Sequence, residues 1–342
     1  MKGRGRVSIF FLILILAVGV FFLFNSPTAQ AKPIELSYAN FFPPTHIQAE
    51  LGASWAKEIE KRTNGKVKIT YYPGGALLKG PKIYDGVRKG IADIGMSVFG
   101  YSRGVFPAME AMDLPMGYPS GMAATTIIND YYNKFKPKEL TKVKPMYLHA
   151  HGPGLLHTKK PVHKLEDVKG LKIRSYGFNA KLAKALGGVP VAMSQGGVYE
   201  ALQKGVVDAT LSPMEVLKGW KQAEVVKETV ECYSVGYTAG FYVAMNLDKW
   251  NSLPKDVQKV FEEVSKEWIP KTGAAWDSSD KAGREFTLSL GNKIFALSPE
   301  QSAVWAKAAK PVIAGYIKDK EAKGLPAKAY VDFIQEAVKK SK

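Results

Sequence analysis

Residues 84–97, YDGVRKGIADIGMS, and residues 199–212, YEALQKGVVDATLS, are two versions of one pattern. Tyr, Lys, Gly, Asp and Ser are identical between them, and most other positions are chemically similar. Each copy predicts a helix ended by a glycine in the left-handed conformation, then a short strand entered through an aspartate. The copies lie too far apart for a solenoid repeat, so they predict one α/β unit in each of two domains. The alternative is a chance match between two ordinary helix–strand turns.

The length of 342 residues also favours two domains, and an apolar content of 46% indicates a well-packed globular protein. The formal net charge is +17, to which Lys2, Arg4 and Arg6 contribute. Such a charge suits small acids, nucleic acid or a membrane surface without choosing among them. Most lysines fall at expected helix ends and solvated faces, so solubility is the simpler explanation. Because no RNP, zinc-finger or basic-zipper pattern occurs, we do not expect a nucleic-acid partner.

The N-terminal stretch has the features of an export signal. A basic start precedes an uninterrupted apolar run over residues 7–24, and Ala29-Gln30-Ala31 forms a small-residue cleavage site. We therefore expect a signal peptide over residues 1–31, cleavage after Ala31 and a periplasmic protein. The apolar run approaches the roughly 20 residues that a spanning helix needs, so an uncleaved membrane anchor is the alternative.

Beyond the leader, strand-like and helix-like segments alternate, which is typical of α/β domains with mainly parallel sheets. Thr45 with Gln48 has the spacing of a capping box before one helix, and Ser298 with Gln301 before another. From Pro254 onward the pattern is helical. The other expected elements are strands within 34–40, 66–72, 146–152, 154–162 and 171–174, and helices within 179–188 and 215–227.

The chain contains no nucleophile elbow, no phosphate-binding glycine loop and no H-E-x-x-H motif. His149 and His151 share a face of an expected strand, a geometry that could hold a metal, but no Cys or carboxylate-rich partner lies nearby in the sequence. Cys232 is the only cysteine, so an intramolecular disulfide is impossible and a small buried side chain is expected. We therefore predict neither catalysis nor a metal or cofactor.

The ends of the expected strands carry aromatic side chains. In open α/β sheets, ligands bind beyond the carboxyl ends of strands, so the segments 97–104 and 212–219, which follow the two repeat copies, are candidate walls of a cleft. Each aromatic residue alone is more often part of a core than of a ligand site, but their repeated placement favours a cleft. The aromatic candidates are Phe41, Phe42, Phe99, Tyr101, Tyr176, Phe178, Phe241 and Tyr242.

Arg174 ends the apolar strand signal within VKGLKIRSYG, residues 168–177, just before a glycine-containing turn. A planar guanidinium pairs with a carboxylate through two hydrogen bonds and stays charged when partly desolvated, so it suits an organic acid. Composition and spacing alone favour the alternative, an ion pair at the surface.

Four segments together resemble the solute-binding proteins of TRAP transporters, the DctP family. The resemblance covers nearly the whole exported chain and involves separate motifs in a fixed order. The segments are GKVKITYYPGGAL (65–77), HTKKPVHKLEDVKGLKIRSYG (157–177), VYEALQKGVVDATLSPMEVLK (198–218) and YVAMNLDKWNSLPKDVQKVFEEVS (242–265).

The resemblance implies a two-lobed periplasmic-binding-protein fold of type II-like α/β architecture, with an interlobe cleft, crossover strands and a long helix that braces both lobes. We place the first lobe at residues 32–154 plus 241–279, and the second at 155–240 plus 280–342. The implied protein is a monomeric receptor, not an enzyme, that hands a small organic acid to the membrane permease of a TRAP transporter.

In that family the arginine of the GLKIR motif binds the ligand carboxylate, which implies this role for Arg174. Two departures from sugar-acid members matter: HAHGPGLLH (149–157) lacks a second arginine, and Ser212 stands where they have asparagine. We therefore expect a monocarboxylate or keto acid with an apolar or aromatic body. The full set of predicted ligand-binding residues is Arg174, Phe42, Phe99, Tyr101, Tyr176, Phe241, His46, His151, Ser212 and Glu215.

Three other classes remain open from the sequence. A receptor for an ATP-driven ABC importer would share the lobes and differ in its membrane partner. A periplasmic enzyme would need an acid–base pair in the cleft, and a basic protein tethered by an uncleaved leader would bind polyanions in a salt-dependent way.

Overall fold

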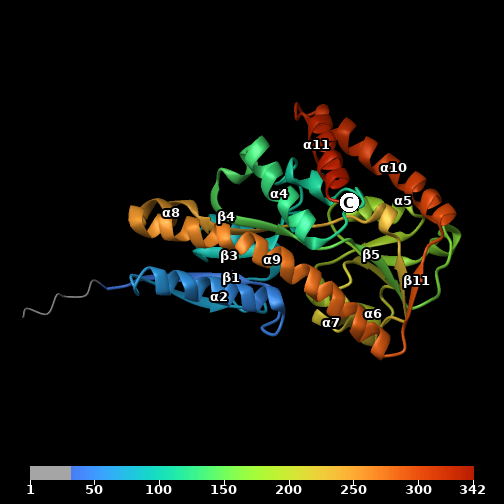
Figure 1. Ribbon diagram of the computed structural model, residues 1–342, viewed down its shortest axis with the longest axis horizontal. Coiled ribbons are helices and arrows are strands. Elements are labelled where there is room, and N and C mark those ends of the chain that lie inside the picture. The colour runs from blue at the N-terminus through green and yellow to red at the C-terminus, as the bar shows by residue number, and fades with distance from the viewer. Residues whose placement is uncertain (1–31) are drawn as a thin grey trace, which may run out of the picture. The chain divides into compact units, whose positions relative to one another are not determined.

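The computed structural model describes residues 32–342, so the predicted signal peptide and its cleavage after Ala31 lie outside the described residues. Residues Glu35–Lys342 form one compact unit, whose ribbon is shown in Figure 1. Within residues 32–342, every helix is too short or too polar to cross a bilayer.

One β-sheet has five strands and carries the N-terminal part of the chain. β1 and β3 run parallel, whereas β10 enters between β3 and β4 and is antiparallel to both. A strand from late in the sequence therefore completes a sheet that begins at the N-terminal end. In spatial order the strands are β2 (Val67–Tyr72), β1 (Ile34–Asn40), β3 (Ile94–Val98), β10 (Gly240–Asn246) and β4 (Val143–Ala150).

The second sheet has six strands. β6 pairs in parallel with β7 and β8, β11 pairs in parallel with β9, and β5 is antiparallel to both β8 and β9. In spatial order they are β11 (Lys293–Ala296), β9 (Glu228–Glu231), β5 (Leu155–Thr158), β8 (Ala209–Ser212), β6 (Lys172–Ser175) and β7 (Val189–Ala192).

The chain crosses between the sheets in both directions: residues 151–154 lead from β4 into β5, and residues 232–239 lead from β9 into β10. Two α/β sheets joined in this way confirm the predicted two-lobed fold. The residue boundaries of the two lobes stay a prediction. Cys232 lies fully buried in the apolar core of the second sheet, as predicted, and burial raises the pKa of its thiol to about 12.

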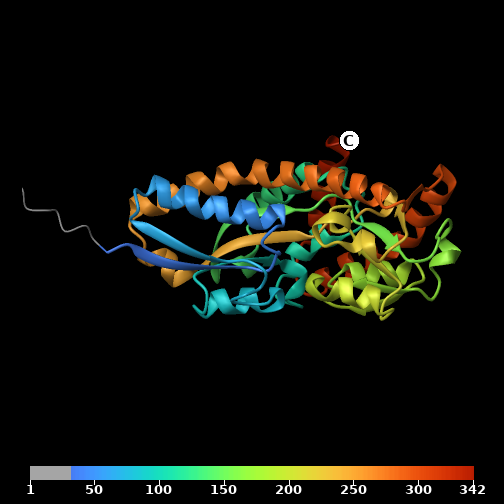
Figure 2. The same cartoon turned by 90° about the horizontal axis from the view of Figure 1, so that it is seen from below.

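Helices pack against both sheets, as Figures 1 and 2 show. α3 packs on β3, α4 on β4, and α10 on α5, while α11 lies against α10 and α4. The helices are α2 (Ile47–Arg62), α3 (Gly80–Arg88), α4 (Gly121–Phe135), α5 (Asn179–Ala185), α6 (Val198–Gln203), α7 (Val216–Gly219), α8 (Leu247–Ser252), α9 (Lys255–Ser289), α10 (Pro299–Glu321) and α11 (Ala327–Lys340).

The internal repeat forms the same unit twice, α3–β3 in the first sheet and α6–β8 in the second. Gly90 and Gly205 both have positive φ, +74° and +72°, which confirms the predicted left-handed helix ends. Asp93 accepts a 2.8 Å hydrogen bond from the backbone N–H of Ser37 in β1, and Asp208 a 2.9 Å bond from that of Lys172 in β6. Each aspartate thus ties its strand to the parallel neighbour.

The start of α2 differs from the prediction. The N-cap is His46 rather than Thr45, because the Nδ1 atom of His46 accepts the backbone N–H of Gln48 at 3.2 Å. At α10 the predicted cap is confirmed, since the hydroxyl of Ser298 accepts the backbone N–H of Gln301 at 3.2 Å. The side-chain oxygen of Gln301 has no partner among the described residues, so the capping box is not closed.

The helix expected over residues 215–227 is wrong as a single element. α7 ends at Gly219, Lys221 adopts a left-handed φ of +56°, and a separate 3₁₀ turn covers Gln222–Glu224. Asn292 donates a 2.6 Å hydrogen bond to the carbonyl of Ala223, which holds the second piece against the end of α9. The break falls beside Trp220, and that residue faces the cavity described below.

α9 spans 35 residues and packs against both halves of the molecule, as expected of a bracing helix (Figure 1). It contacts α2, α4 and β4 in the half of the first sheet, and α7 and β11 in the half of the second. Two aspartates one turn apart bind α9 to both halves of the molecule, one to the start of α4 and the other to the start of α7. Asp277 accepts the backbone N–H of Gly121 at 2.6 Å, where the positive end of the α4 dipole favours a carboxylate. Asp280 accepts the backbone N–H of Glu215 at 2.8 Å.

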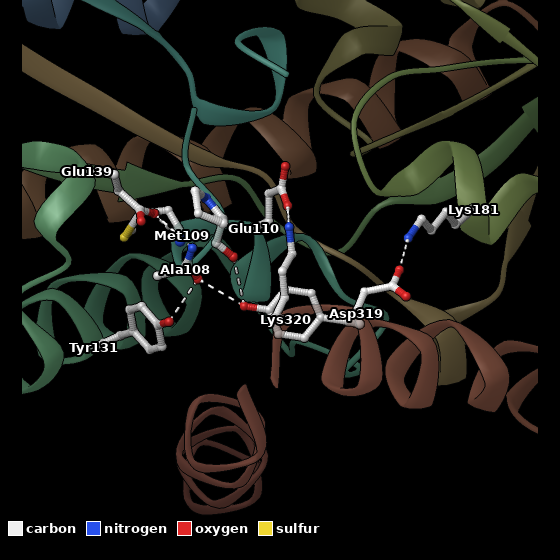
Figure 3. Close-up of polar contacts among 10 residues, drawn as sticks. Ala108, Met109, Glu110, Tyr131, Glu139, Lys181, Asp319 and Lys320 are labelled. Carbon is white, nitrogen blue, oxygen red and sulfur yellow. Dashed lines mark hydrogen bonds and ion pairs between the residues drawn. The ribbon is translucent and has the colours of Figure 1, made fainter. Parts of the chain in front are cut away.

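A second connection between the two sides runs through α10 (Figure 3). Lys320 forms an ion pair with Glu110 in the 3₁₀ turn Met109–Asp113, and both side chains are largely buried. Glu139 accepts the backbone N–H groups of Ala108 and Met109 at 2.9 and 2.8 Å, and burial raises its pKa to about 7. The turn is therefore held by partners from several elements.

Gly283 in α9 allows a close approach of this helix to the segment that follows β8. A Cβ at this position would lie 2.2 Å from the carbonyl oxygen of Met214, which is backbone and cannot rotate away. Gly315 in α10 has no atom within 4 Å of the same virtual position. Gly315 can therefore serve as the control for Gly283, because both glycines lie inside helices and only Gly283 is tightly packed.

We expect Gly283→Ala to lower the free energy of unfolding by about 1–3 kcal/mol, because overpacking outweighs the gain in helix propensity. Gly315→Ala should leave it unchanged or raise it by up to about 1 kcal/mol. Urea denaturation followed by circular dichroism measures both. Equal effects of the two substitutions would contradict the close approach.

Candidate functional site

A cavity lies between the ends of strands from both sheets. Its walls come from the segments after β1, β3 and β4, from β10, and from the second sheet through β6, β8 and α7. The free volume is about 30 Å³, which is room for one or two water molecules and too little for a ring. The lining residues are Phe41, Phe42, Val98, Tyr101, His151, Arg174, Tyr176, Gln195, Ser212, Pro213, Glu215, Val216, Trp220, Tyr237 and Phe241.

Arg174 is 2% exposed, although it carries a permanent charge. Its Nε donates to the carbonyl of Met193 at 3.2 Å and its Nη1 to the hydroxyl of Ser212 at 3.3 Å. The Nη2 atom is buried and has no partner among residues 32–342, and no ion pair of Arg174 with a carboxylate is found there. The sequence alternative of a surface ion pair therefore does not describe this residue.

The position of Arg174 follows from its strand. β6 pairs on both sides, with β7 and β8, so the residues of β6 are buried from Ile173 onward. The guanidinium lies over the ring of Tyr176, with 4.8 Å between Cζ and the ring centroid. Cation–π contact and two neutral acceptors stabilise the charge, yet neither neutralises it.

Aromatic rings form two groups in the cavity wall. Phe42 stacks on Phe41 at 4.5 Å between centroids and contacts Trp220 at 5.7 Å and Phe241 at 5.9 Å. In the second group, Tyr101 meets Tyr176 edge-to-face at 5.0 Å. The two groups contact each other, since Phe41 meets Tyr101 edge-to-face at 5.7 Å, and together they line the cavity with aromatic rings.

His46 and Glu215 join the two sides of the cavity. The Nε2 of His46 lies 2.8 Å from Oε2 of Glu215, and both side chains are buried. Because Nδ1 of His46 accepts the N–H of Gln48, the ring proton is on Nε2 and donates to the carboxylate. This contact links the start of α2 to the start of α7.

His151 and Ser212 complete the polar part of the wall. The Nδ1 of His151 lies 2.5 Å from the carbonyl oxygen of Gly152. Burial, with a smaller contribution from the charge of Arg174, lowers the pKa of His151 to about 4. The hydroxyl of Ser212 accepts from Arg174 and donates to the carbonyl of Leu211 at 2.8 Å.

The structure brings eight of the ten sequence-predicted residues into the cavity lining. His46 lies directly behind the lining, through its contact with Glu215. Phe99 lies outside the lining, because the 3₁₀ turn Phe99–Tyr101 directs it into the core against Phe106 and Tyr242 at 4.9 and 5.2 Å. The eight are Phe42, Tyr101, His151, Arg174, Tyr176, Ser212, Glu215 and Phe241.

Several lining residues were not predicted, and Trp220, Gln195 and Tyr237 are the most prominent. Trp220 lies between the end of α7 at Gly219 and the left-handed Lys221, a break that the helical pattern of residues 215–227 concealed. Gln195 is brought in because its backbone N–H donates to the hydroxyl of Tyr101 at 2.9 Å. One indication for Trp220 was present in the sequence: this aromatic residue directly follows residues 212–219, the segment that was expected to form a wall of the cleft.

Each histidine near the cavity makes its own hydrogen bonds to protein groups. His149 accepts the indole N–H of Trp276 at 3.0 Å and stacks on Phe241 at 4.8 Å, and burial lowers its pKa to about 3. Within residues 32–342, no cluster of three or more His, Cys, Asp or Glu side chains could hold a metal ion.

The sequence matches a family model along most of its length. Residues 38–319 fit the model of the bacterial extracellular solute-binding protein, family 7, or DctP. The chain belongs to this family. It is thus a solute-binding protein of the TRAP transporter type, a family of receptors for small organic acids outside the cytoplasm.

Three relatives illustrate the range of the family. The C4-dicarboxylate-binding periplasmic protein DctP of Rhodobacter capsulatus is 28% identical over 296 residues, 84% of this chain and 87% of its own. A TRAP solute-binding protein of Desulfovibrio salexigens is 34% identical, with a TM-score of 0.79 over 90% of this chain and 97% of its own. It was crystallised as an open complex with the C-terminus of a symmetry mate in its ligand-binding site.

The third relative is a TRAP solute-binding protein from an unidentified marine microbe that is specific for aromatic acids. It was crystallised with 3-hydroxybenzoate and is 29% identical to this chain. The TM-score is 0.86 over 91% of this chain and 99% of its own, so the two folds agree along nearly their whole length.

His157 is buried beside this site, and its lowered pKa can be tested through the dependence of protein stability on pH. Its Nε2–H donates to the carbonyls of Ser212 and Pro213, and burial lowers its pKa to about 4, below the unfolded value of about 6.5. Between these values the unfolded chain binds a proton that the folded chain does not bind. His157 therefore makes stability fall as the pH falls through this window, by up to about 1.4 kcal/mol per pH unit.

We expect His157→Gln to have a shallower dependence of stability on pH than the wild type between about pH 6.5 and pH 4. The variant should be less stable at neutral pH, and the difference in free energy of unfolding between the two proteins should become smaller as the pH falls. Urea denaturation across this range provides the measurement, and two parallel curves would contradict the lowered pKa.

Proposed function

We propose that this protein binds a small monocarboxylate or keto acid with an apolar or aromatic body in the cavity and delivers it to a TRAP-type permease. In this proposal Arg174 anchors the carboxylate. The single observation that carries it is the buried guanidinium, whose Nη2 has no partner among the described residues. A ligand carboxylate would supply the missing negative charge and accept from this atom.

The charges of the wall favour one carboxylate over two. Among the lining residues, Arg174 is the cation, while Glu215 carries the opposite charge and already accepts from His46. A second ligand carboxylate would be desolvated without a cationic partner, which is costly. The dicarboxylate named for the Rhodobacter relative is therefore not the ligand class that we propose here.

The aromatic walls support an apolar or aromatic body. Phe41, Phe42, Trp220 and Phe241 offer ring faces, and rings gain energy from such packing beyond the burial of area alone. The marine relative that is specific for aromatic acids has the same fold, which supports a similar class of ligand.

Binding requires the two sides of the cavity to separate. Since the free volume of about 30 Å³ cannot admit a ring, a ligand enters only if the lobes or the aromatic walls move. Closure then removes water and strengthens the charge-assisted hydrogen bonds. The open complex of the Desulfovibrio relative supports such a movement, and the His46–Glu215 contact would form on closing.

Membership of the family supports the permease as the partner and a location outside the cytoplasm. Cleavage after Ala31 and release into the periplasm are part of the proposal. The family consists of receptors, which favours delivery of an unchanged ligand over its chemical conversion.

Arg174→Lys tests the anchor, because an ammonium cannot reproduce the two parallel hydrogen bonds of a guanidinium. We expect the Kd for benzoate, measured by calorimetry, to rise about 100-fold, and further for Arg174→Ala. Arg62→Lys, a change on the exposed face of α2, is the control and should leave the Kd unchanged. If Arg174→Lys and Arg174→Ala bind benzoate as the wild type does, the anchor is refuted.

Trp220→Ala tests the aromatic wall. We expect the Kd for benzoate to rise at least about tenfold, because ring contact and apolar burial are both lost. The Kd for pyruvate, which has no ring, should change much less. Trp220→Phe keeps a ring face and is the matched control. Equal losses for benzoate and pyruvate would show that Trp220 supports the fold rather than the ligand body.

A further inference from the structure

The hydrogen bond of His151 to the backbone fixes the tautomer of its ring. A carbonyl oxygen can only accept, so the Nδ1 atom that lies 2.5 Å from the Gly152 oxygen must carry the proton. The ring is neutral at physiological pH, since burial and the nearby Arg174 lower its pKa to about 4. A neutral ring with its proton on Nδ1 has a lone pair on Nε2, which therefore acts as an acceptor.

Packing holds this orientation. The ring of His151 meets Tyr237 edge-to-face at 5.4 Å and lies 6.1 Å from the rings of Phe241 and Trp276. The hydroxyl of Thr238 donates to the backbone carbonyl of His151 at 2.6 Å, which fixes the main chain as well. Because Nδ1 faces the Gly152 carbonyl, Nε2 on the other side of the ring is directed away from it.

The Nε2 atom of His151 makes no hydrogen bond within residues 32–342, although the residue lines the cavity. Three other lining residues carry buried donor atoms that have no partner among the described residues: Nη2 of Arg174, Nε2 of Gln195 and Nε1 of Trp220. The cavity thus offers donors for a carboxylate, together with Nε2 of His151 as an acceptor whose orientation is fixed.

We propose that His151 determines ligand specificity by accepting a hydrogen bond from a hydroxyl group, so that the ligand is a hydroxylated monocarboxylic acid. This inference rests on the proposed function and narrows it. A hydroxyl donates to Nε2, an unsubstituted acid leaves Nε2 buried without a partner, and an oxo group places its own lone pairs against it. The site therefore favours a hydroxy acid over the matching deoxy or oxo acid.

Glu215 is the competing acceptor in the wall. Its Oε2 accepts from Nε2 of His46 and its backbone N–H is held by Asp280, so the carboxylate already has a structural partner. A test must nevertheless separate the two residues, because either could face a ligand hydroxyl.

The test compares ligands that differ in one group: 3-hydroxybenzoate with benzoate, and mandelate with phenylacetate and phenylglyoxylate. Calorimetry gives the Kd of each acid, and the preference is the ratio within a pair. We expect the wild type to prefer the hydroxylated member of at least one pair by about tenfold or more. In His151→Phe the ratio should fall close to one, whereas in His151→Gln, which keeps an acceptor, it should persist. In Glu215→Leu, which removes the competing acceptor, it should also persist.

A second measurement needs no variant. The ¹⁵N resonance of the unprotonated Nε2 of His151 should shift when the preferred hydroxy acid is added, and not with its deoxy counterpart. This result would support the inference even if His151→Phe failed to fold.

The inference is overturned if acids bind in an Arg174-dependent manner without any preference for a hydroxyl group. It is also overturned if the preference survives in His151→Phe or disappears only in Glu215→Leu. These outcomes leave the proposed function intact. Failure of every acid in the panel to bind would instead overturn the proposed function, and this inference with it.

Discussion

The burial of one guanidinium constrains the rest of the site. Arg174 is enclosed between β7 and β8, against the ring of Tyr176, with a carbonyl and a hydroxyl as its neutral acceptors. A buried charge without a counter-ion costs several kcal/mol in a protein interior. The packing of the fold offsets this cost. In the proposed function, the donor without a partner favours an anion, so the site is arranged for an acid before the acid binds.

The scaffold that holds this charge is built from two similar halves and one long helix. The repeated units α3–β3 and α6–β8 bring the ends of parallel strands toward the cavity, and α9 fixes both halves through Asp277 and Asp280. The contacts of α9 differ from the His46–Glu215 contact in the type of group that they join. Those of α9 are made to backbone groups that remain in place when side chains move, whereas the His46–Glu215 contact joins two side chains across the cavity. This arrangement suits a molecule that opens and closes around a fixed brace.

The chemistry of the wall is divided between the two sides. The second sheet supplies Arg174 and Ser212, while the segments after β1 and β4 supply Phe42 and His151. A ligand that contacts only one side leaves groups of the other side without a partner, either buried hydrogen-bond donors or apolar surface. In the proposed function, selection therefore depends on the charge, the body and the further polar group of the acid, rather than on the carboxylate alone.

The sequence by itself determined most local elements and the duplicated α/β unit, because periodicity and glycine conformation act over short distances. It did not determine that Arg174 is buried, since composition and spacing alone favoured a surface ion pair. It failed where a side chain's direction depends on a turn or a distant partner. Phe99 is directed into the core by a 3₁₀ turn, and the helix before Trp220 ends at Gly219, ahead of the left-handed Lys221. The acceptor on His151 was decided by the tertiary structure alone, since the proton position depends on one carbonyl oxygen and on how the packed rings orient the imidazole.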